Sequence, residues 1–106
     1  MTDKIVVITT VSTKEEADRI AAKLIEDQLA ACVTVFPGAE SVYRWKGQIE
    51  RASELLLLIK SRRDLMPKLS EALQSIHSYE TPEVLAVPVV DGSAAYLEWL
   101  DHQLLS

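Results

Sequence analysis

The chain has 106 residues, of which 48% are hydrophobic and 25% are charged, and its formal net charge is −5. This length suits a single domain spanning residues 1–106, and the composition excludes a disordered, collagen-like or low-complexity chain. Proteins that bind nucleic acid through its phosphates usually carry a basic excess, so the acidic balance argues against a nucleic-acid partner.

The cysteine content and the hydropathy of the chain further restrict the class of protein. Cys32 is the only cysteine, which excludes an intrachain disulfide and a zinc site built from cysteines alone. No apolar run approaches the roughly 20 residues that span a bilayer, and residues 1–4 lack the features of a signal peptide. We therefore expect a cytoplasmic protein with no membrane partner.

The first half of the chain predicts a strand, a helix and a long hairpin. Residues 4–10 form a continuous β-branched run, typical of a strand in the middle of a sheet. Ser12 and Glu15 have the spacing of a capping box, which predicts the start of a helix with Glu16 on its charged, solvent-facing side. The predicted apolar stripe of this helix is Ala17, Ile20, Ala21, Leu24, Ile25 and Leu29.

The hairpin follows directly. Residues 31–45 predict one strand with a kink or bulge at Pro37-Gly38, because strand character resumes after these residues. A turn signal at Lys46-Gly47 precedes a returning strand over residues 48–60, which ends in the apolar run Leu55–Ile59. We therefore expect a long antiparallel hairpin that turns near Gly47.

The second half predicts a helix, a strand and a short final helix. Asp64 is expected to cap the helix, with Pro67 in its first turn and an apolar stripe at Leu65, Leu69, Ala72, Leu73 and Ile76. Residues 77–82 predict a loop, and residues 83–90 a strand in which Pro88 favours an edge or a bulge. Residues 91–93 are expected to cap the last helix, whose apolar side carries Tyr96, Leu97, Leu100 and Leu104.

The order β-α-β-β-α-β-α predicts an α+β fold, namely a ferredoxin-like split β-α-β sandwich with both main helices on one face of an antiparallel sheet. The hairpin arms run to about twelve residues or more against about seven in the first and last strands, so the hairpin must project beyond the sheet. It carries apolar side chains such as Tyr43 and Trp45, and an exposed hairpin of this kind is unstable alone. The sequence therefore predicts a homo-oligomer.

Several motifs together resemble the CutA family of divalent-cation-tolerance proteins. They are LAACVTVFPG at residues 29–38, SVYRWKG at 41–47, Glu54 and Lys60, HSYETPE at 77–83 and YLEWL at 96–100. The resemblance covers nearly the whole chain in order. It implies a ferredoxin-like homotrimer in which hairpins of neighbouring subunits pair, kinship with the PII signalling proteins, and a link to copper and other divalent metals.

The chain departs from the family pattern at several positions. Thr34, Ser61 and Ser78 stand where the family usually has Asn, Thr and Pro. Members implicated in copper binding have a cysteine where this chain has Thr9, and a pair of histidines where it has Ile76-His77. Two of the three ligands that the resemblance suggests for copper are therefore absent.

The candidate metal ligands that remain are His77, Glu83 and Cys32. His77 could bind a metal or carry a proton, but a histidine at a helix end more often caps the last carbonyls and fixes the loop. Cys32 could be a soft ligand for Cu(I), although its apolar strand favours a buried, inert cysteine. Tyr79, Glu80 and Glu83 could act as hard ligands or as acid/base groups, or could simply anchor the loop.

A second candidate set would hold an anionic metabolite between subunits: Lys60, Arg44, Trp45, Tyr43 and Tyr79. Lys60 and Arg44 could equally pair with Glu54 or Glu83, and hairpin aromatics more often form interface core.

The chain has no phosphate-binding glycine loop, zinc-protease motif or serine-nucleophile motif. We therefore expect a non-enzymatic trimer for divalent-ion tolerance, with copper or another divalent cation and no organic cofactor. The alternatives are a PII-like sensor of an anionic effector and a stable trimeric scaffold for other proteins.

Overall fold

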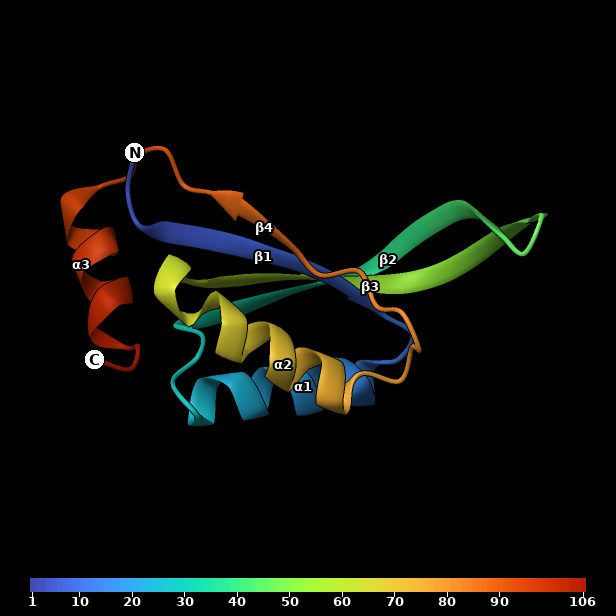
Figure 1. Cartoon of the computed structure of the whole chain (residues 1–106), viewed down its shortest axis with the longest axis horizontal. Helices are drawn as coiled ribbons and strands as arrows, with labels where there is room; N and C mark the ends of the chain where they lie inside the picture. The colour runs from blue at the N-terminus through green and yellow to red at the C-terminus, as the bar shows by residue number, and fades with distance from the viewer.

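The computed structural model describes all residues from 1 to 106. Its elements in chain order are β1 (Lys4–Val11), α1 (Lys14–Glu26), β2 (Cys32–Trp45), β3 (Gln48–Arg62), a 3-10 turn η1 (Arg63–Leu65), α2 (Met66–Ile76), β4 (Leu85–Pro88) and α3 (Ala94–His102). The strands form one antiparallel sheet in the order β2-β3-β1-β4. Figure 1 shows α1 and α2 side by side on one face of this sheet, which confirms the predicted ferredoxin-like sandwich.

The hydrophobic core lies between the sheet and the two main helices. Alternate residues of β1, among them Ile5 and Val7, point toward the helices and are almost fully buried. They pack with Leu57 and Ile59 of β3 and with the apolar stripes of α1 and α2, which contribute Ile20, Leu24, Leu69 and Leu73. Burial of each such aliphatic side chain contributes about 1.5–3 kcal/mol to folding. No helix of the structure is long and apolar enough to cross a membrane.

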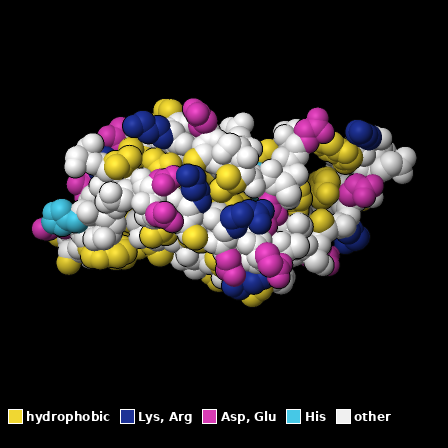
Figure 2. Space-filling view, turned by 90° about the horizontal axis from the view of Figure 1, so that it is seen from below, with side chains coloured by type: hydrophobic (Ala, Val, Ile, Leu, Met, Phe, Trp, Pro, Cys, Tyr) yellow, Lys and Arg dark blue, Asp and Glu magenta, His cyan; other side chains and the backbone are white.

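The other face of the sheet carries no helix, and we call it the open face. Cross-strand partners share a face, so the register assigns to it Val6, Ile8, Thr10, Cys32, Thr34, Phe36, Leu56, Leu58, Lys60, Leu85 and Val87. These residues are mostly apolar, yet Phe36, Leu85 and Val87 are 50%, 57% and 45% exposed. From the helix side, by contrast, acidic and basic side chains are interspersed over the surface, and hydrophobic ones show both at the hairpin end and at the opposite end (Figure 2).

The β2–β3 hairpin projects beyond the sheet, as predicted, and elongates the molecule to 45 × 26 × 23 Å (Figure 1). A β-bulge lies between Phe36 and Ala39, where Gly38 adopts a φ of 81°. The turn places Lys46 and Gly47 at φ 50° and 80°, the left-handed geometry of a tight two-residue hairpin turn. Past the bulge, the odd-numbered residues of β2 pair with the even-numbered residues of β3, which continue the open face.

Both main helices begin differently from the prediction. The N-cap of α1 is Thr13, whose hydroxyl accepts a hydrogen bond from the Glu16 N–H at 3.1 Å, so the capping pair is Thr13 and Glu16. Asp64 does not cap α2, because its carboxylate accepts a hydrogen bond from Arg62 Nε at 2.7 Å. The turn η1 leads into α2, and Pro67 in the first turn removes one N–H that would otherwise need a cap.

The last strand is shorter than predicted, since β4 covers only Leu85–Pro88 rather than residues 83–90. It is an edge strand, as the proline at its end indicated. The predicted cap of α3 is confirmed, because the Ser93 hydroxyl accepts a hydrogen bond from the Tyr96 N–H at 3.3 Å.

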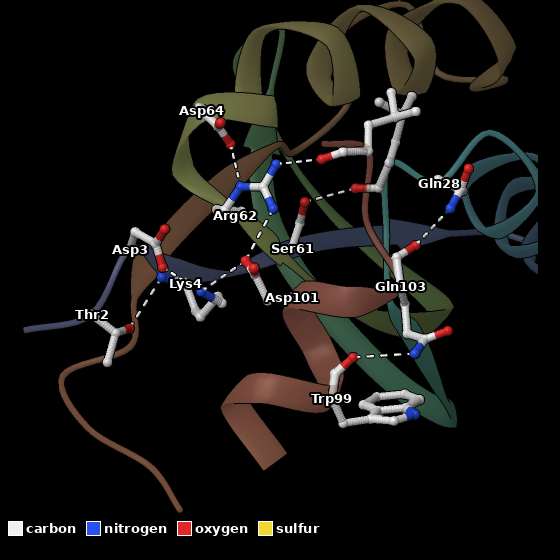
Figure 3. A network of polar contacts seen from close by, with 12 residues as sticks. Thr2, Asp3, Lys4, Gln28, Ser61, Arg62, Asp64, Trp99, Asp101 and Gln103 are labelled. Carbon is white, nitrogen blue, oxygen red and sulfur yellow. Dashed lines mark hydrogen bonds and ion pairs between the residues drawn. The ribbon is translucent and has the colours of Figure 1, made fainter. Parts of the chain in front are cut away.

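A charged cluster fixes α3 against the sheet, and we call it the α3 clamp (Figure 3). The Asp101 carboxylate accepts a hydrogen bond from Arg62 Nη1 at 3.0 Å and pairs with Lys4 Nζ at 3.2 Å. Arg62 also donates to the carbonyl of Leu105. The hydrogen bonds from Arg62 and Lys4 hold the pKa of Asp101 below its usual range, so the clamp is charged at neutral pH.

Candidate ligand-binding cleft

A cleft of about 590 Å³ opens where the hairpin leaves the sheet. Its walls come from the end of β1, the distal part of β2, one residue of β3 and the loop between α2 and β4. The lining residues are Thr10, Ser41, Val42, Tyr43, Trp45, Glu54, Tyr79, Glu80, Thr81 and Glu83. The walls thus combine aromatic rings with carboxylates and hydroxyls, and contain no lysine or arginine.

Tyr79 and Glu54 join the loop to the hairpin. The Tyr79 hydroxyl donates a hydrogen bond of 2.6 Å to Glu54 Oε2. Burial, together with this neighbouring carboxylate, raises the pKa of Tyr79 well above its usual value, so the phenol keeps its proton and remains a donor. Glu54 is only 6% exposed although it lines the cleft.

His77 is buried at the C-terminal end of α2 and holds the loop with both ring nitrogens. Nε2 lies 2.9 Å from the carbonyl oxygen of Thr10, and because a carbonyl only accepts, Nε2 carries the hydrogen. Nδ1 accepts a hydrogen bond from the backbone N–H of Tyr79 at 3.1 Å. In this conformation the ring fixes the position of Tyr79 and offers no free nitrogen to a metal.

Glu16 anchors the same loop from α1. Its carboxylate accepts hydrogen bonds from the Ser78 backbone N–H at 2.7 Å and from the Ser78 hydroxyl at 3.0 Å. Burial alone would raise the pKa of Glu16, but the hydrogen bonds from Ser78 outweigh it and hold that pKa below its usual value. The prediction that Glu16 faces solvent is therefore wrong, since it is 3% exposed and its partner lies in the loop.

The structure does not bring the predicted metal ligands together within one chain. Glu83 lines the cleft and is exposed, whereas His77 lies beneath the loop. Cys32 lies on the open face, where its Sγ is 3.7 Å from Lys60 Nζ and 3.8 Å from Thr34 Oγ1. No group of three or more His, Cys, Asp or Glu side chains is placed to hold a metal ion.

The residues predicted for an anionic ligand are divided between three places. Tyr43, Trp45 and Tyr79 line the cleft, as expected for a binding site. Arg44 pairs across the hairpin with Ile49 and faces the opposite side, because neighbouring strand residues alternate. Lys60 lies elsewhere on the open face and donates a hydrogen bond of 2.6 Å to the Thr34 hydroxyl.

Comparison with known proteins places this arrangement in a family. The family model described as CutA1 divalent ion tolerance protein matches residues 5–103. The chain belongs to the CutA1 family. This confirms the resemblance that the sequence motifs indicated.

Relatives in the CutA1 family come from bacteria, plants and animals. The divalent-cation tolerance protein CutA of Thermus thermophilus is 45% identical over 95 residues, covering 90% of this chain and 92% of that protein. A chloroplastic CutA protein of Arabidopsis thaliana is 46% identical over 98 residues, covering 92% of this chain. The chain spans only about half the length of the Arabidopsis, rice and mouse relatives that it matches, at 54%, 55% and 53%.

Solved CutA1 structures share the fold. The structure of CutA1 from Oryza sativa superposes with a TM-score of 0.95 at 43% identity and covers 98% of this chain and 95% of its own. The Thermus thermophilus structure gives a TM-score of 0.93 at 42% identity and covers 95% of this chain and 98% of its own.

The cleft of this CutA1 chain contains residues that the sequence analysis did not place there. Glu54 was considered only as a partner for Lys60 or Arg44, and Thr10 and Ser41 were not singled out. The sequence did hold one signal for the composition of the cleft. Tyr43 and Trp45 are two residues apart and so share one face of the strand, while Arg44 between them faces the other way. The contact of Tyr79 with Glu54 joins residues 25 positions apart, and no local pattern predicts it.

Proposed function

We propose that this protein takes part in divalent-cation tolerance by binding a divalent cation at the cleft, without catalysing a reaction. Its CutA1 relatives are named for divalent-cation tolerance, which supports the general role. The observation that carries the proposal is the charge of the cleft. Glu54, Glu80 and Glu83 line it, and no lysine or arginine among the lining residues neutralises them.

Glu80 and Glu83 are the ligands that we assign to the cation. Both are exposed at the cleft and form no ion pair in the chain. Carboxylate oxygens suit hard divalent cations, and Cu(II) also accepts oxygen ligands. Two carboxylates are fewer than a tight site needs, so water or a second copy of the chain would complete the coordination. A site that also used His77 and Cys32 would need residues from more than one copy.

We also propose that the protein works as a homotrimer. The open face and the hairpin expose apolar side chains that a stable monomer would cover, including Phe36, Leu85, Val87 and Ile49. Association of copies through these surfaces would remove them from water. The number three comes from the family resemblance.

Calorimetric titration of Cu(II) into the native protein tests the metal site, with Mg(II) in large excess to suppress binding to surface charge. We expect a saturable isotherm with integral stoichiometry per assembly. Replacing both ligands, Glu80→Gln with Glu83→Gln, should weaken binding by about ten-fold or more, because the cation loses two charged oxygen ligands.

A matched control removes the same charge elsewhere. The pair Glu71→Gln with Glu98→Gln lies on exposed positions of α2 and α3 and should leave the affinity for Cu(II) unchanged. Equal weakening in both double variants would mean that only surface charge attracts the metal. That result would overturn the assignment of Glu80 and Glu83.

A further inference from the structure

We propose that the cleft is a binding site for an organic ammonium ion, specifically a protonated primary amine that carries an apolar body. The inference goes beyond cation tolerance, because it needs no metal and uses a different part of the same cleft. It follows from the size of the cleft, from its aromatic walls and from one buried carboxylate.

The size of the cleft fits a small organic molecule. At about 590 Å³ it lies within the range of small-molecule sites, roughly 300–1,000 Å³, and far exceeds the space of a bare metal ion. It opens on the open face of the sheet, between the hairpin and the loop after α2. A ligand there would touch elements that lie far apart in the sequence.

The walls present aromatic faces to such a ligand. Tyr43 and Trp45 lie two residues apart on one side of β2, and they are 46% and 48% exposed. Tyr79 faces them from the loop. Aromatic faces attract cations, with Trp the strongest. The apolar edge of Val42 would contact the body of the amine.

Glu54 supplies the anchor for the charge. It is 94% removed from solvent, being 6% exposed, and Tyr79 is the one protein group that donates a hydrogen bond to it. That bond engages Oε2, while Oε1 has no donor in the protein and is not sealed from the cleft. No lysine or arginine pairs with this carboxylate. A poorly solvated carboxylate with a free oxygen favours a ligand that brings both N–H donors and positive charge.

An ammonium ion suits these groups better than the alternatives. An anion would meet three carboxylates and no basic side chain in the walls. No group of three or more metal-ligating side chains includes Glu54, so a metal ion at this carboxylate would lack ligands, unlike the cation assigned to Glu80 and Glu83. A primary ammonium ion needs one carboxylate as anchor, and its hydroxyl neighbours, Thr10 and Ser41, can accept its remaining hydrogens.

The binding test uses 2-phenylethylammonium as probe, in buffer that contains a metal chelator. The variant Trp99→Phe leaves Trp45 as the only tryptophan, so its fluorescence reports on the cleft directly. We expect a saturable change in Trp45 emission, with one probe bound per chain. The uncharged isostere 2-phenylethanol should bind about ten-fold more weakly or not at all, since it lacks the charge.

Two variants assign the interaction. Glu54→Gln keeps an acceptor for Tyr79 but removes the charge, and it should weaken binding of the probe by about 10- to 100-fold. Trp45→Leu, read by calorimetry, should weaken it by roughly ten-fold. Glu98→Gln on α3 is the control and should bind the probe as the parent does. Thermal unfolding and molar mass establish that each variant remains folded and assembled.

The outcomes separate this inference from the metal proposal. Equal binding of amine and alcohol, or unchanged affinity in Glu54→Gln, would show an apolar surface without charge recognition and would overturn the inference. So would the absence of saturation. Because the chelator removes metal ions, failure of Cu(II) binding does not affect this result. Likewise, amine binding would be no evidence for the carboxylates Glu80 and Glu83 as metal ligands.

Discussion

Glu16 belongs to α1, but its main contacts lie in the loop that follows α2. Its carboxylate accepts two hydrogen bonds from Ser78, and the residues on either side of Ser78 complete the anchor. His77 is bound to β1, and the Tyr79 hydroxyl is bound to Glu54. The position of one wall of the cleft therefore depends on a buried acid that does not line it.

The first prediction concerns the pH dependence that Glu16 introduces. Its folded-state pKa lies below the ordinary value of 4.5, so its contribution to stability is present above pH 4.5 and is lost as the pH falls through the folded pKa. At pH 7 we expect Glu16→Gln to lower the free energy of unfolding by about 1–3 kcal/mol, because a charged acceptor is lost.

Urea unfolding at fixed protein concentration measures this effect at pH 7 and at several values below 4.5. The difference between the parent and Glu16→Gln should shrink as the solution becomes more acidic. Glu15→Gln, at the neighbouring exposed position, should show neither the loss nor the pH dependence. A constant difference at every pH would contradict the role assigned to the Glu16 charge.

At the scale of elements, the sequence predicted those features of the hairpin that depend on residues close together in the chain. Strand alternation, the Pro37-Gly38 bulge and the Lys46-Gly47 turn are local signals, and they define the hairpin. The predicted caps of α1 and α2 each lie one residue before the observed ones, because two capping spacings overlap at 12–16 and because the Asp64 carboxylate bonds to Arg62. Both choices are made between neighbouring groups that the sequence pattern does not rank.

The second prediction concerns the α3 clamp. Asp101→Asn removes the negative charge that Arg62 and Lys4 share and leaves them paired only with Asp64 and Asp3, which do not belong to α3. We expect the amides of α3 to exchange with deuterium faster, while those of β1 and β3 keep their rates. Glu98→Gln, on the same helix but outside the clamp, serves as the control. Unchanged exchange in α3 would show that Leu100 and Leu104 hold the helix without the charges.

At the scale of the whole molecule, the open face is the feature that a single chain does not explain. Its strands alternate correctly and its helices cover the other side, so the apolar residues on it are not errors of folding. The cleft lies on the same face, so ligand binding is linked to the copies of the chain that we propose cover the sheet. The excess length of the hairpin arms and their apolar side chains predicted an oligomer, but the position of the cleft required the register of all strands together.

The third prediction tests that interface. Val87→Glu places a charge on the open face. We expect the molar mass measured by light scattering to fall from that of three chains, each of 11.8 kDa, to that of a single chain. Ile25→Glu changes a residue of similar exposure on α1, 43% against 45% for Val87, and should leave the assembly intact. A trimer that survives Val87→Glu, or one that both variants dissociate, would place the interface elsewhere.

The bulge at Gly38 has a consequence for how this chain can change in length. It offsets β2 by one residue, and the cleft receives Tyr43 and Trp45 only because of that offset. A single-residue insertion or deletion in β2 between the bulge and the turn would reverse which side chains face the cleft and present Arg44 in place of Tyr43 and Trp45. The site would then lose two aromatic rings and place a guanidinium among its carboxylates, which would weaken its attraction for cations. Changes by two residues would preserve the chemistry, so the distal hairpin can lengthen or shorten only in steps of two without altering what the cleft recognises.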